Sequence, residues 1–263
     1  MLEIAVSRPI FFRGSRNIEI YFLNVVKSAE RAIIMRMIKV SCVIPAYNEA
    51  PTIANTLQVA TDAGNILDEI IVVDDGSIDD TRKIVGTFSN VRLLVNERNQ
   101  GKSKTIARGV TEASGEYILM LDADLKGLNA ENIRSLIRPV ADGVSDIVVS
   151  MRGNTPGWMR AIGIDCMSGE RVLPKSLFTT HMEKIGNLRN FGLEVFLNKI
   201  IIENKLRVKT VMMANVFNNM KVNKLNFWRG LWGEILMWRD IFKTVSLSEF
   251  ISQNIELRKL LVK

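Results

Sequence analysis

Two aspartates separated by a single residue, Asp122 and Asp124, are the side chains of this chain best suited to chemistry. They follow a short apolar run at residues 117–121, which is rich in β-prone residues and typical of a buried strand. Carboxylates spaced in this way suit a hard divalent cation, often one carried together with a substrate diphosphate. We therefore interpret them as ligands of Mg²⁺ or Mn²⁺.

A second acidic pair, Asp74 and Asp75, ends an earlier apolar run at residues 70–73. In open α/β sheets, ligands bind beyond the carboxyl ends of the strands. We therefore expect both acidic pairs to face one crevice, whose natural occupant is a nucleoside diphosphate with a metal. A carboxylate of the second pair can accept hydrogen bonds from a base N–H or from ribose hydroxyls, and Gly76 permits a tight turn there.

The remaining nucleotide-binding candidates lie near two other expected turns. Pro45, Tyr47 and Glu49 follow the first expected strand, where backbone groups and the glutamate could hold the base or ribose. Lys102 follows Gly101 at the start of an expected helix, and a helix N-terminus with a cation favours phosphate. The glycine spacing is not that of a P-loop.

The elements that position these residues alternate regularly from residue 38 onward. Strands are expected at 38–45, 68–73, 91–95, 117–121 and 146–150, with helices at 50–63, 79–88, 102–113 and 130–141. This alternation predicts an α/β fold, a mostly parallel sheet covered by helices on both faces. After residue 151 the rhythm loosens, and only a helix at 188–204 and a strand at 206–213 are expected.

The two ends of the chain differ from this central domain, which we place at residues 37–222. Residues 1–36 show no such alternation, and we interpret them as an extension or an over-called start; a docking amphipathic helix at 18–34 is the alternative. Residues 223–263 are expected to form a basic, amphipathic helical tail. The tail's apolar stripe either packs on the domain or meets a membrane interface; it comprises Phe227, Leu231, Ile235, Trp238 and Phe242.

Composition narrows the class of protein. No uninterrupted apolar stretch reaches about 18 residues, and the N-terminus lacks the layout of a signal peptide. With Cys42 inside an expected strand, we expect a reduced, cytoplasmic setting, with peripheral contact at the inner face of a membrane left open by the basic tail. The lone His181 and two distant cysteines argue against zinc, and no recognition motif supports nucleic-acid binding.

Four motifs in this order resemble those of the family 2 glycosyltransferases with a GT-A (Rossmann-like) fold. They are Val43-Ile-Pro-Ala-Tyr-Asn-Glu49, Ile71-Val-Val-Asp-Asp-Gly-Ser77, Asn99-Gln-Gly-Lys102 and Leu121-Asp-Ala-Asp-Leu125. Weaker matches resemble the branch that includes dolichyl-phosphate sugar synthases and glucosyl-3-phosphoglycerate synthases. These are Ser168-Gly-Glu-Arg171, Phe191-Gly-Leu-Glu194 and Met220-Lys221.

The resemblance implies a glycosyltransferase that moves a sugar from a nucleoside-diphosphate sugar to an acceptor, such as a lipid phosphate or a glycan precursor. Glu170 and Asp124 are the catalytic candidates that it implies, with Glu170 as general base and Glu194 as the alternative. An ionised lipid phosphate would need no base. Asn218 corresponds to a position where related enzymes carry a metal-binding histidine, so it is the third metal candidate.

Two other functions remain open at this stage. One is a non-catalytic nucleotide-sugar-binding or membrane-docked homologue, which Asn218 and the basic tail would suit. The other is a sugar-1-phosphate nucleotidyltransferase, although that enzyme needs a Gly-rich, Arg-bearing loop where this chain has Pro-Ala-Tyr-Asn-Glu. The sequence does not determine the sugar, the base, the acceptor or the stereochemical outcome.

Overall fold

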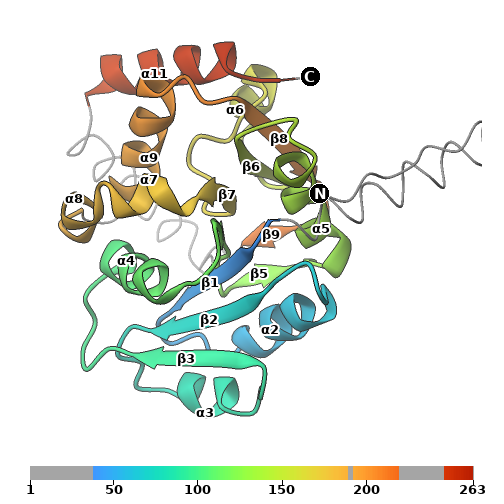
Figure 1. Cartoon of the computed structure of the whole chain (residues 1–263), viewed down its shortest axis with the longest axis vertical. Coiled ribbons are helices and arrows are strands. Elements are labelled where there is room, and N and C mark those ends of the chain that lie inside the picture. The colour runs from blue at the N-terminus through green and yellow to red at the C-terminus, as the bar shows by residue number, and fades with distance from the viewer. Residues whose placement is uncertain (1–37, 189–191, 219–245, 263) are drawn as a thin grey trace, which may run out of the picture.

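A seven-stranded sheet, with the order β3-β2-β1-β4-β7-β6-β8, organises the part of the chain that the structure describes. The structure is a computed structural model that describes residues 38–188, 192–218 and 246–262 (Figure 1). The strands are β1 (Val40–Ala46), β2 (Glu69–Asp74), β3 (Val91–Val95), β4 (Tyr117–Met120), β6 (Ile147–Arg152), β7 (Arg171–Pro174) and β8 (Val208–Met213). The expected mostly parallel α/β sheet is confirmed.

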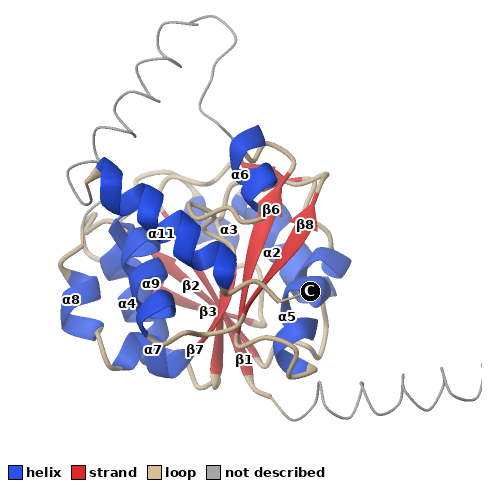
Figure 2. Ribbon diagram, turned by 90° about the horizontal axis from the view of Figure 1, so that it is seen from above, coloured by secondary structure: helices blue, strands red, loops and turns tan. Residues whose placement is uncertain are grey.

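Helices cover both faces of this sheet (Figure 2). The first part of the chain contributes α2 (Ile53–Asp62), α3 (Thr81–Val85), α4 (Lys102–Glu112) and α5 (Ala130–Ala141). The later part contributes α6 (Gly157–Ile162), α7 (Lys175–Thr179), α8 (Met182–Gly186), α9 (Gly192–Glu203) and α11 (Leu247–Lys259).

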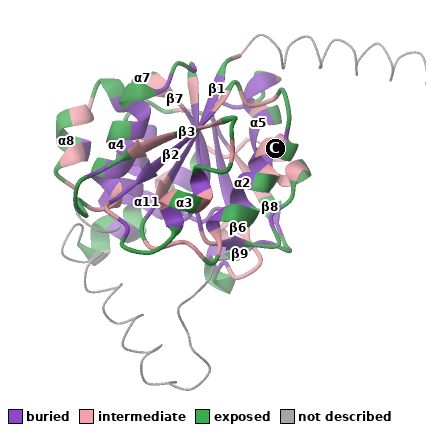
Figure 3. Cartoon of the chain, turned by 90° about the horizontal axis from the view of Figure 1, so that it is seen from below, coloured by how far each residue is buried: buried purple, intermediate pink, exposed green. Residues whose placement is uncertain are grey.

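The apolar residues of each strand divide between two cores, one on each face. Along β1, Val43 joins the core that contains α4, α9 and α11, whereas Cys42 and Ile44 join the core that contains α2 and α5. Successive side chains of a strand point to opposite faces, so an uninterrupted apolar strand fills both cores. In Figure 3 the central strands of the sheet carry the colour of buried residues.

One strand of the seven-stranded sheet was not expected from the sequence. β7 lies between β4 and β6 and runs antiparallel to both, with Met120 opposite Arg171 and Val148 opposite Val172. Four residues, one of them arginine and one proline, are too few to show a strand period, and the strand forms through long-range pairing. The helix expected at 79–88 is also shorter, since α3 spans Thr81–Val85.

A small second sheet pairs β5 (Leu125–Lys126) with β9 (Phe217–Asn218). Leu125 lies opposite Asn218, so the backbone of Asn218 runs beside the residue that follows Asp124. Gly127 makes this pairing compatible with the loop before β9. It has a φ of +73°, and a Cβ there would collide with the carbonyl oxygen of Asn215.

The C-terminal residues that the structure describes pack with the rest of the domain rather than as a separate tail. Phe250 and Leu257 of α11 are buried in the same core as α9, and Val208 of β8 exchanges backbone hydrogen bonds with Leu260 and Val262. The domain boundary expected at 222/223 stays a prediction. The aromatic stripe at 227–243 and the segment 1–36 lie outside the described residues.

No helix within the described ranges is long and apolar enough to cross a membrane.

Candidate active site

The loops that follow β1 and β2 are joined by hydrogen bonds from backbone amides to side chains. The amide of Asn48 donates to Ser77 Oγ at 2.9 Å, and the amide of Glu49 donates to Thr81 Oγ1 at 2.8 Å. In return, Asn48 Oδ1 accepts from the amide of Ile78 at 2.9 Å. Asn48 has a φ of 55°, a region that asparagine tolerates better than most residues. The two loops therefore form one braced unit at the carboxyl edge of the sheet.

Asp75 connects this unit to the loop that precedes α4. Its carboxylate is 3% exposed and accepts from Asn96 Nδ2 at 2.7 Å, from the Gln100 amide at 2.9 Å and from the Gly101 amide at 2.9 Å. Gly101 has a φ of 91° as the residue before α4. Asp75 thus fixes where α4, and with it Lys102, begins.

Asp74 is fully buried, and its carboxylate also accepts hydrogen bonds from nearby residues of the chain. Its Oδ2 accepts from the amide of Ser77 at 3.1 Å and from Arg82 Nε at 2.6 Å. Gly76 lets the intervening turn pass closely beneath Arg98, because a Cβ there would lie 2.6 Å from the Arg98 carbonyl carbon. The structure therefore gives both aspartates a bracing role, and direct contact of either with a nucleotide stays a prediction.

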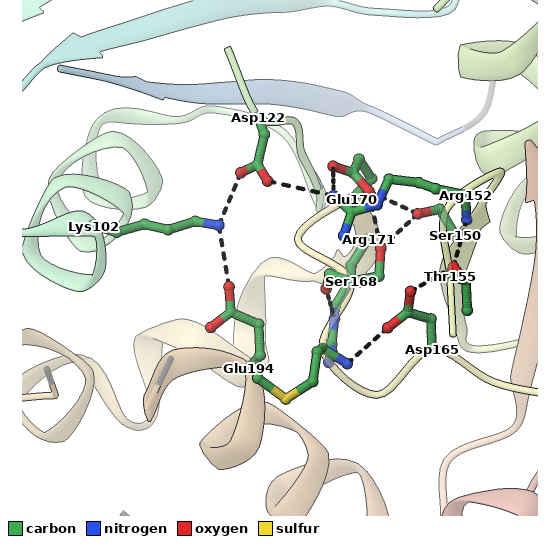
Figure 4. Close-up of polar contacts among 11 residues, drawn as sticks. Lys102, Asp122, Ser150, Arg152, Thr155, Asp165, Ser168, Glu170, Arg171 and Glu194 are labelled. Carbon is green, nitrogen blue, oxygen red and sulfur yellow. Dashed lines mark hydrogen bonds and ion pairs between the residues drawn. The ribbon is translucent and has the colours of Figure 1, made fainter. Parts of the chain in front are cut away.

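A chain of alternating charges lies beyond the end of β4 (Figure 4). Lys102 Nζ is 2.8 Å from Asp122 Oδ1 and 3.1 Å from Glu194 Oε1. On the other side of Asp122, Arg152 Nη1 is 4.0 Å from Asp122 Oδ2 and 3.2 Å from Glu170 Oε1. The five side chains come from α4, the end of β4, β6, the loop before β7, and α9, so only the tertiary fold brings them together.

Glu170 lies behind Asp122 and is fully buried. Its Oε2 accepts from Ser150 Oγ at 2.8 Å and from Ser168 Oγ at 2.9 Å, while Oε1 pairs with Arg152. Burial raises the pKa of Glu170, against the opposing effect of the arginine. Both carboxylate oxygens are engaged, so the structure does not favour the predicted role of general base. Its cationic partner is Arg152 and not the neighbouring Arg171.

Asp122 is held as a carboxylate between cations. Burial would raise its pKa, but Lys102 and Arg152 outweigh it and the pKa lies below the usual value. Gly169 passes so close that a Cβ would lie 2.6 Å from Asp122 Oδ2. The glycine therefore determines the space available to this carboxylate.

Asp124 differs from Asp122 in that it forms no ion pair within 4.0 Å among the described residues, although its charge acts on Arg152. Burial, the charge of Asp122 and the charge of Glu49 raise the pKa of Asp124 to about 6. Negative charge is thus concentrated where the two aspartates meet, and a divalent cation would relieve it, so these residues fit a metal of the type expected. Within the described residues, no group of three or more histidine, cysteine or acidic side chains is arranged to hold a metal by itself.

Arg171 fixes the loop that carries Glu170, and the sequence analysis assigned it no role. It is fully buried and donates to Ser168 O at 2.8 Å, to Asn198 Oδ1 at 2.7 Å and to Cys166 O at 2.7 Å. Asn198 belongs to α9, so this arginine ties the loop to that helix. The sequence does not show whether an arginine is buried or exposed, so only the motif match at 168–171 could have pointed to a role for Arg171.

Of the other predicted residues, Glu49 and Tyr47 lie on the loop after β1. Glu49 Oε2 accepts from Thr52 Oγ1 at 2.8 Å, and Tyr47 is 43% exposed. Arg152 and Ser150 were missed because β6 showed no motif, and Ser168 was assigned no role although it belongs to the motif at 168–171. His181 lies away from the carboxylates, with Nδ1 3.1 Å from Leu177 O and its ring against Phe196.

A comparison with known protein families identifies the class to which this fold and site belong. The sequence profile of glycosyl transferase family 2 matches residues 41–186, which is more than half of the chain. The chain belongs to this family.

Particular relatives are similar over shorter stretches. The dolichyl-phosphate β-glucosyltransferase of Dictyostelium discoideum is 29% identical over 183 residues, which are 63% of this chain and 50% of that protein. The undecaprenyl-phosphate 4-deoxy-4-formamido-L-arabinose transferase of Proteus mirabilis is 31% identical over 130 residues, 46% of this chain and 40% of that protein. The matched stretches span half the length of these relatives or less.

Solved structures agree on the fold. Glucosyl-3-phosphoglycerate synthase from Mycobacterium tuberculosis, crystallised with Mn²⁺, uridine diphosphate and phosphoglyceric acid, superposes with a TM-score of 0.66 at 20% identity, covering 86% of this chain and 82% of that chain. A crystal of the same enzyme with Mg²⁺ and uridine diphosphate gives a TM-score of 0.64. The expected GT-A fold is confirmed.

Proposed function

We propose that this protein transfers a sugar from a nucleoside-diphosphate sugar to a lipid phosphate, with the help of Mg²⁺ or Mn²⁺. The observation that carries the proposal is the placement of Asp122 and Asp124 at the carboxyl edge of the sheet, with Lys102 and Arg152 beside Asp122. Carboxylates for a metal and cations for a diphosphate thus meet at one point.

Asp122 and Asp124 would hold the metal. Asn218 is a third candidate, supported by the pairing of its backbone with Leu125. Since two carboxylates are the protein's main contribution, the diphosphate itself would complete the coordination, as is common for Mg²⁺ sites. When bound, the metal would neutralise charge that develops on the departing nucleoside diphosphate.

The protein's own cations would add to that neutralisation. Lys102 lies at the first position of α4, where the helix dipole also favours negative charge. Arg152 is only 11% exposed and is held by Glu170, so its guanidinium is oriented in advance. The braced loops after β1 and β2 would receive the nucleoside, with Pro45, Tyr47, Glu49 and Asp75 as the predicted contacts.

The burial of Glu170 supports an acceptor that needs no general base. A hydroxyl acceptor must lose a proton as it attacks the anomeric carbon, whereas a lipid phosphate is already ionised. The curated relatives named above are dolichyl-phosphate and undecaprenyl-phosphate transferases, which supports the same class of acceptor.

The test is sugar transfer with purified full-length chain, a panel of UDP- and GDP-sugars, and undecaprenyl or dolichyl phosphate in detergent. We expect transfer with Mn²⁺ or Mg²⁺ and its loss in EDTA. If the protein binds the donor but neither hydrolyses it nor transfers its sugar to any lipid or glycan acceptor, the result would instead support a non-catalytic binding protein. Transfer that is unaffected by EDTA would contradict the metal assignment.

A lipid acceptor also implies contact with a membrane surface. The supporting observation is the excess of basic residues in 205–263, where 11 Lys and Arg face 4 Asp and Glu. We expect the protein to sediment with anionic liposomes and less so at high salt. The absence of sedimentation with any lipid composition would contradict this part of the proposal.

A further inference from the structure

In the structure a cation of the chain itself is bound to Asp122. Lys102 Nζ lies 2.8 Å from Asp122 Oδ1, a distance at which the ammonium occupies the space beside that oxygen (Figure 4). A divalent cation bound through the same oxygen would require that space. The proposed metal ligand is therefore already neutralised by a side chain that the metal must displace.

A second carboxylate lets Lys102 leave Asp122 without losing its ion pair. Glu194, in the first turn of α9, is 2% exposed and lies 3.1 Å from the same Nζ. Among the described residues, Lys102 is the cation paired with Glu194, and Glu194 Oε2 has no hydrogen-bond partner there. The lysine side chain is 32% exposed and flexible, so its ammonium can shift while Glu194 retains it.

We propose that Lys102 is a displaceable counterion of the metal site, bound to Asp122 before the donor arrives and to Glu194 and the donor diphosphate afterwards. This inference rests on the proposed function, because it takes Asp122 as a metal ligand. Lys102 and Glu194 would together control when the metal binds, and Lys102 would also make the phosphate contact predicted for it.

The charges explain why such control would couple the metal to the donor. A divalent cation held by Asp122 and Asp124 would lie next to the Lys102 ammonium, which is 2.8 Å from Asp122 Oδ1, and near Arg152, and these like charges repel. A nucleoside diphosphate brings the negative charge that relieves it. Metal and diphosphate should therefore strengthen each other's binding, and by linkage the factor is the same in both directions.

The experiment measures Mn²⁺ binding to the full chain by the loss of the free-ion electron paramagnetic resonance signal, first with Mn²⁺ alone. Lys102→Met is compared with Lys104→Met, which removes the same charge from an exposed position on the same helix. We expect Lys102→Met to tighten Mn²⁺ binding by about tenfold or more, since the removed charge is in direct contact with the ligand. Equal affinities in the two variants would overturn the proposal.

The coupling provides a second readout. The ratio of Mn²⁺ affinities with and without UDP or GDP should be large in the wild type and fall in Lys102→Met, because the displaced cation is gone. A ratio unchanged from that of Lys104→Met would count against the displacement.

Lys102→Met also removes the ammonium that pairs with the buried Glu194 carboxylate, so a second pair of variants avoids leaving this carboxylate without its ion-pair partner. Glu194→Gln is compared with Glu194→Gln/Lys102→Met, which differ only at the lysine, after thermal melting confirms that both are folded. We expect tighter Mn²⁺ binding in the double variant; equal binding would overturn the proposal.

Asp122→Asn distinguishes failure of the metal assignment from failure of the counterion proposal. If it abolishes Mn²⁺ binding while the lysine variants behave as expected, both proposals are supported. If it abolishes binding and the lysine variants have no effect, only the counterion proposal fails. If Asp122→Asn binds Mn²⁺ as the wild type does, the metal assignment fails and the counterion proposal with it.

Discussion

The two halves of the site use polar side chains for different purposes. Around β1 and β2, the side chains of Asn48, Ser77, Thr81 and Asp75 bind backbone amides and brace loops against one another. Beyond β4, the side chains bind other charged side chains, from Lys102 through to Glu170. The first half is thus a rigid frame, whereas the second is a set of charges whose partners can be exchanged for ligands.

The comparison predicts that a change in the charged half reduces activity and spares stability. We expect Asp122→Asn to lower kcat for sugar transfer by about a thousandfold, because a metal is worth several kcal/mol of charge stabilisation. The melting temperature should change little, and Asp62→Asn, an exposed aspartate on α2, serves as the matched control. Transfer at the wild-type rate in Asp122→Asn would remove the basis for calling this half catalytic.

A change in the braced half should do the reverse. Asp75→Ala leaves the Asn96 amide and the backbone amides of Gln100 and Gly101 without their acceptor. We expect the free energy of unfolding, measured with urea, to fall by about 2–4 kcal/mol, since each orphaned buried donor costs about 1–3 kcal/mol. Asp80→Ala, at an exposed position whose side chain makes no capping bond, should be close to neutral. Equal stability of the two variants would mean that the loops are not braced by Asp75.

Gly169 tests how closely the charged half is fitted together. Gly169→Ala places a methyl group against Asp122 Oδ2, so the carboxylate must move. We expect metal affinity, measured by Mn²⁺ titration in the presence of nucleoside diphosphate, to weaken by about tenfold, the scale of effects from residues that orient metal ligands. Gly186→Ala, where a Cβ meets no atom within 4 Å, is the control. Unchanged affinity in Gly169→Ala would show that the position of Asp122 is not critical.

The smallest effect concerns pH. The pKa of Asp124 is raised from 3.8 to about 6, so the folded protein binds this proton more tightly than the unfolded chain does. Its contribution to stability is therefore full below pH 3.8 and is lost as pH rises through 6. Asp124→Asn should remove that slope from urea unfolding measured between pH 4 and 7. In the wild type, Mn²⁺ affinity should rise over the same window, because the metal competes with the proton; a flat profile would contradict the raised pKa.

The sequence by itself determined the part of the molecule in which the candidate site residues directly follow or begin the helices and strands that position them. The first four strands and four helices, the acidic pairs at strand ends and the family motifs depend on local apolar patterns and turns, and the structure confirms the order of these elements. Because parallel strands end at the same edge of a sheet, the expectation that both acidic pairs face one crevice also rests on this local pattern.

Tertiary structure alone decided which charges are buried and which are paired. Lys102 and Glu194 lie 92 positions apart, and their contact depends on where the fold places the first turn of α9 relative to the start of α4. The burial of Glu170 and its ion pair with Arg152 likewise depend on β7, which inserts between β4 and β6 through a pairing with no local signal; the role of Glu170 as a base stays a prediction. The strength of an ion pair and the pKa of a carboxylate depend on burial and on neighbours distant in sequence, and neither quantity exists until the chain has folded.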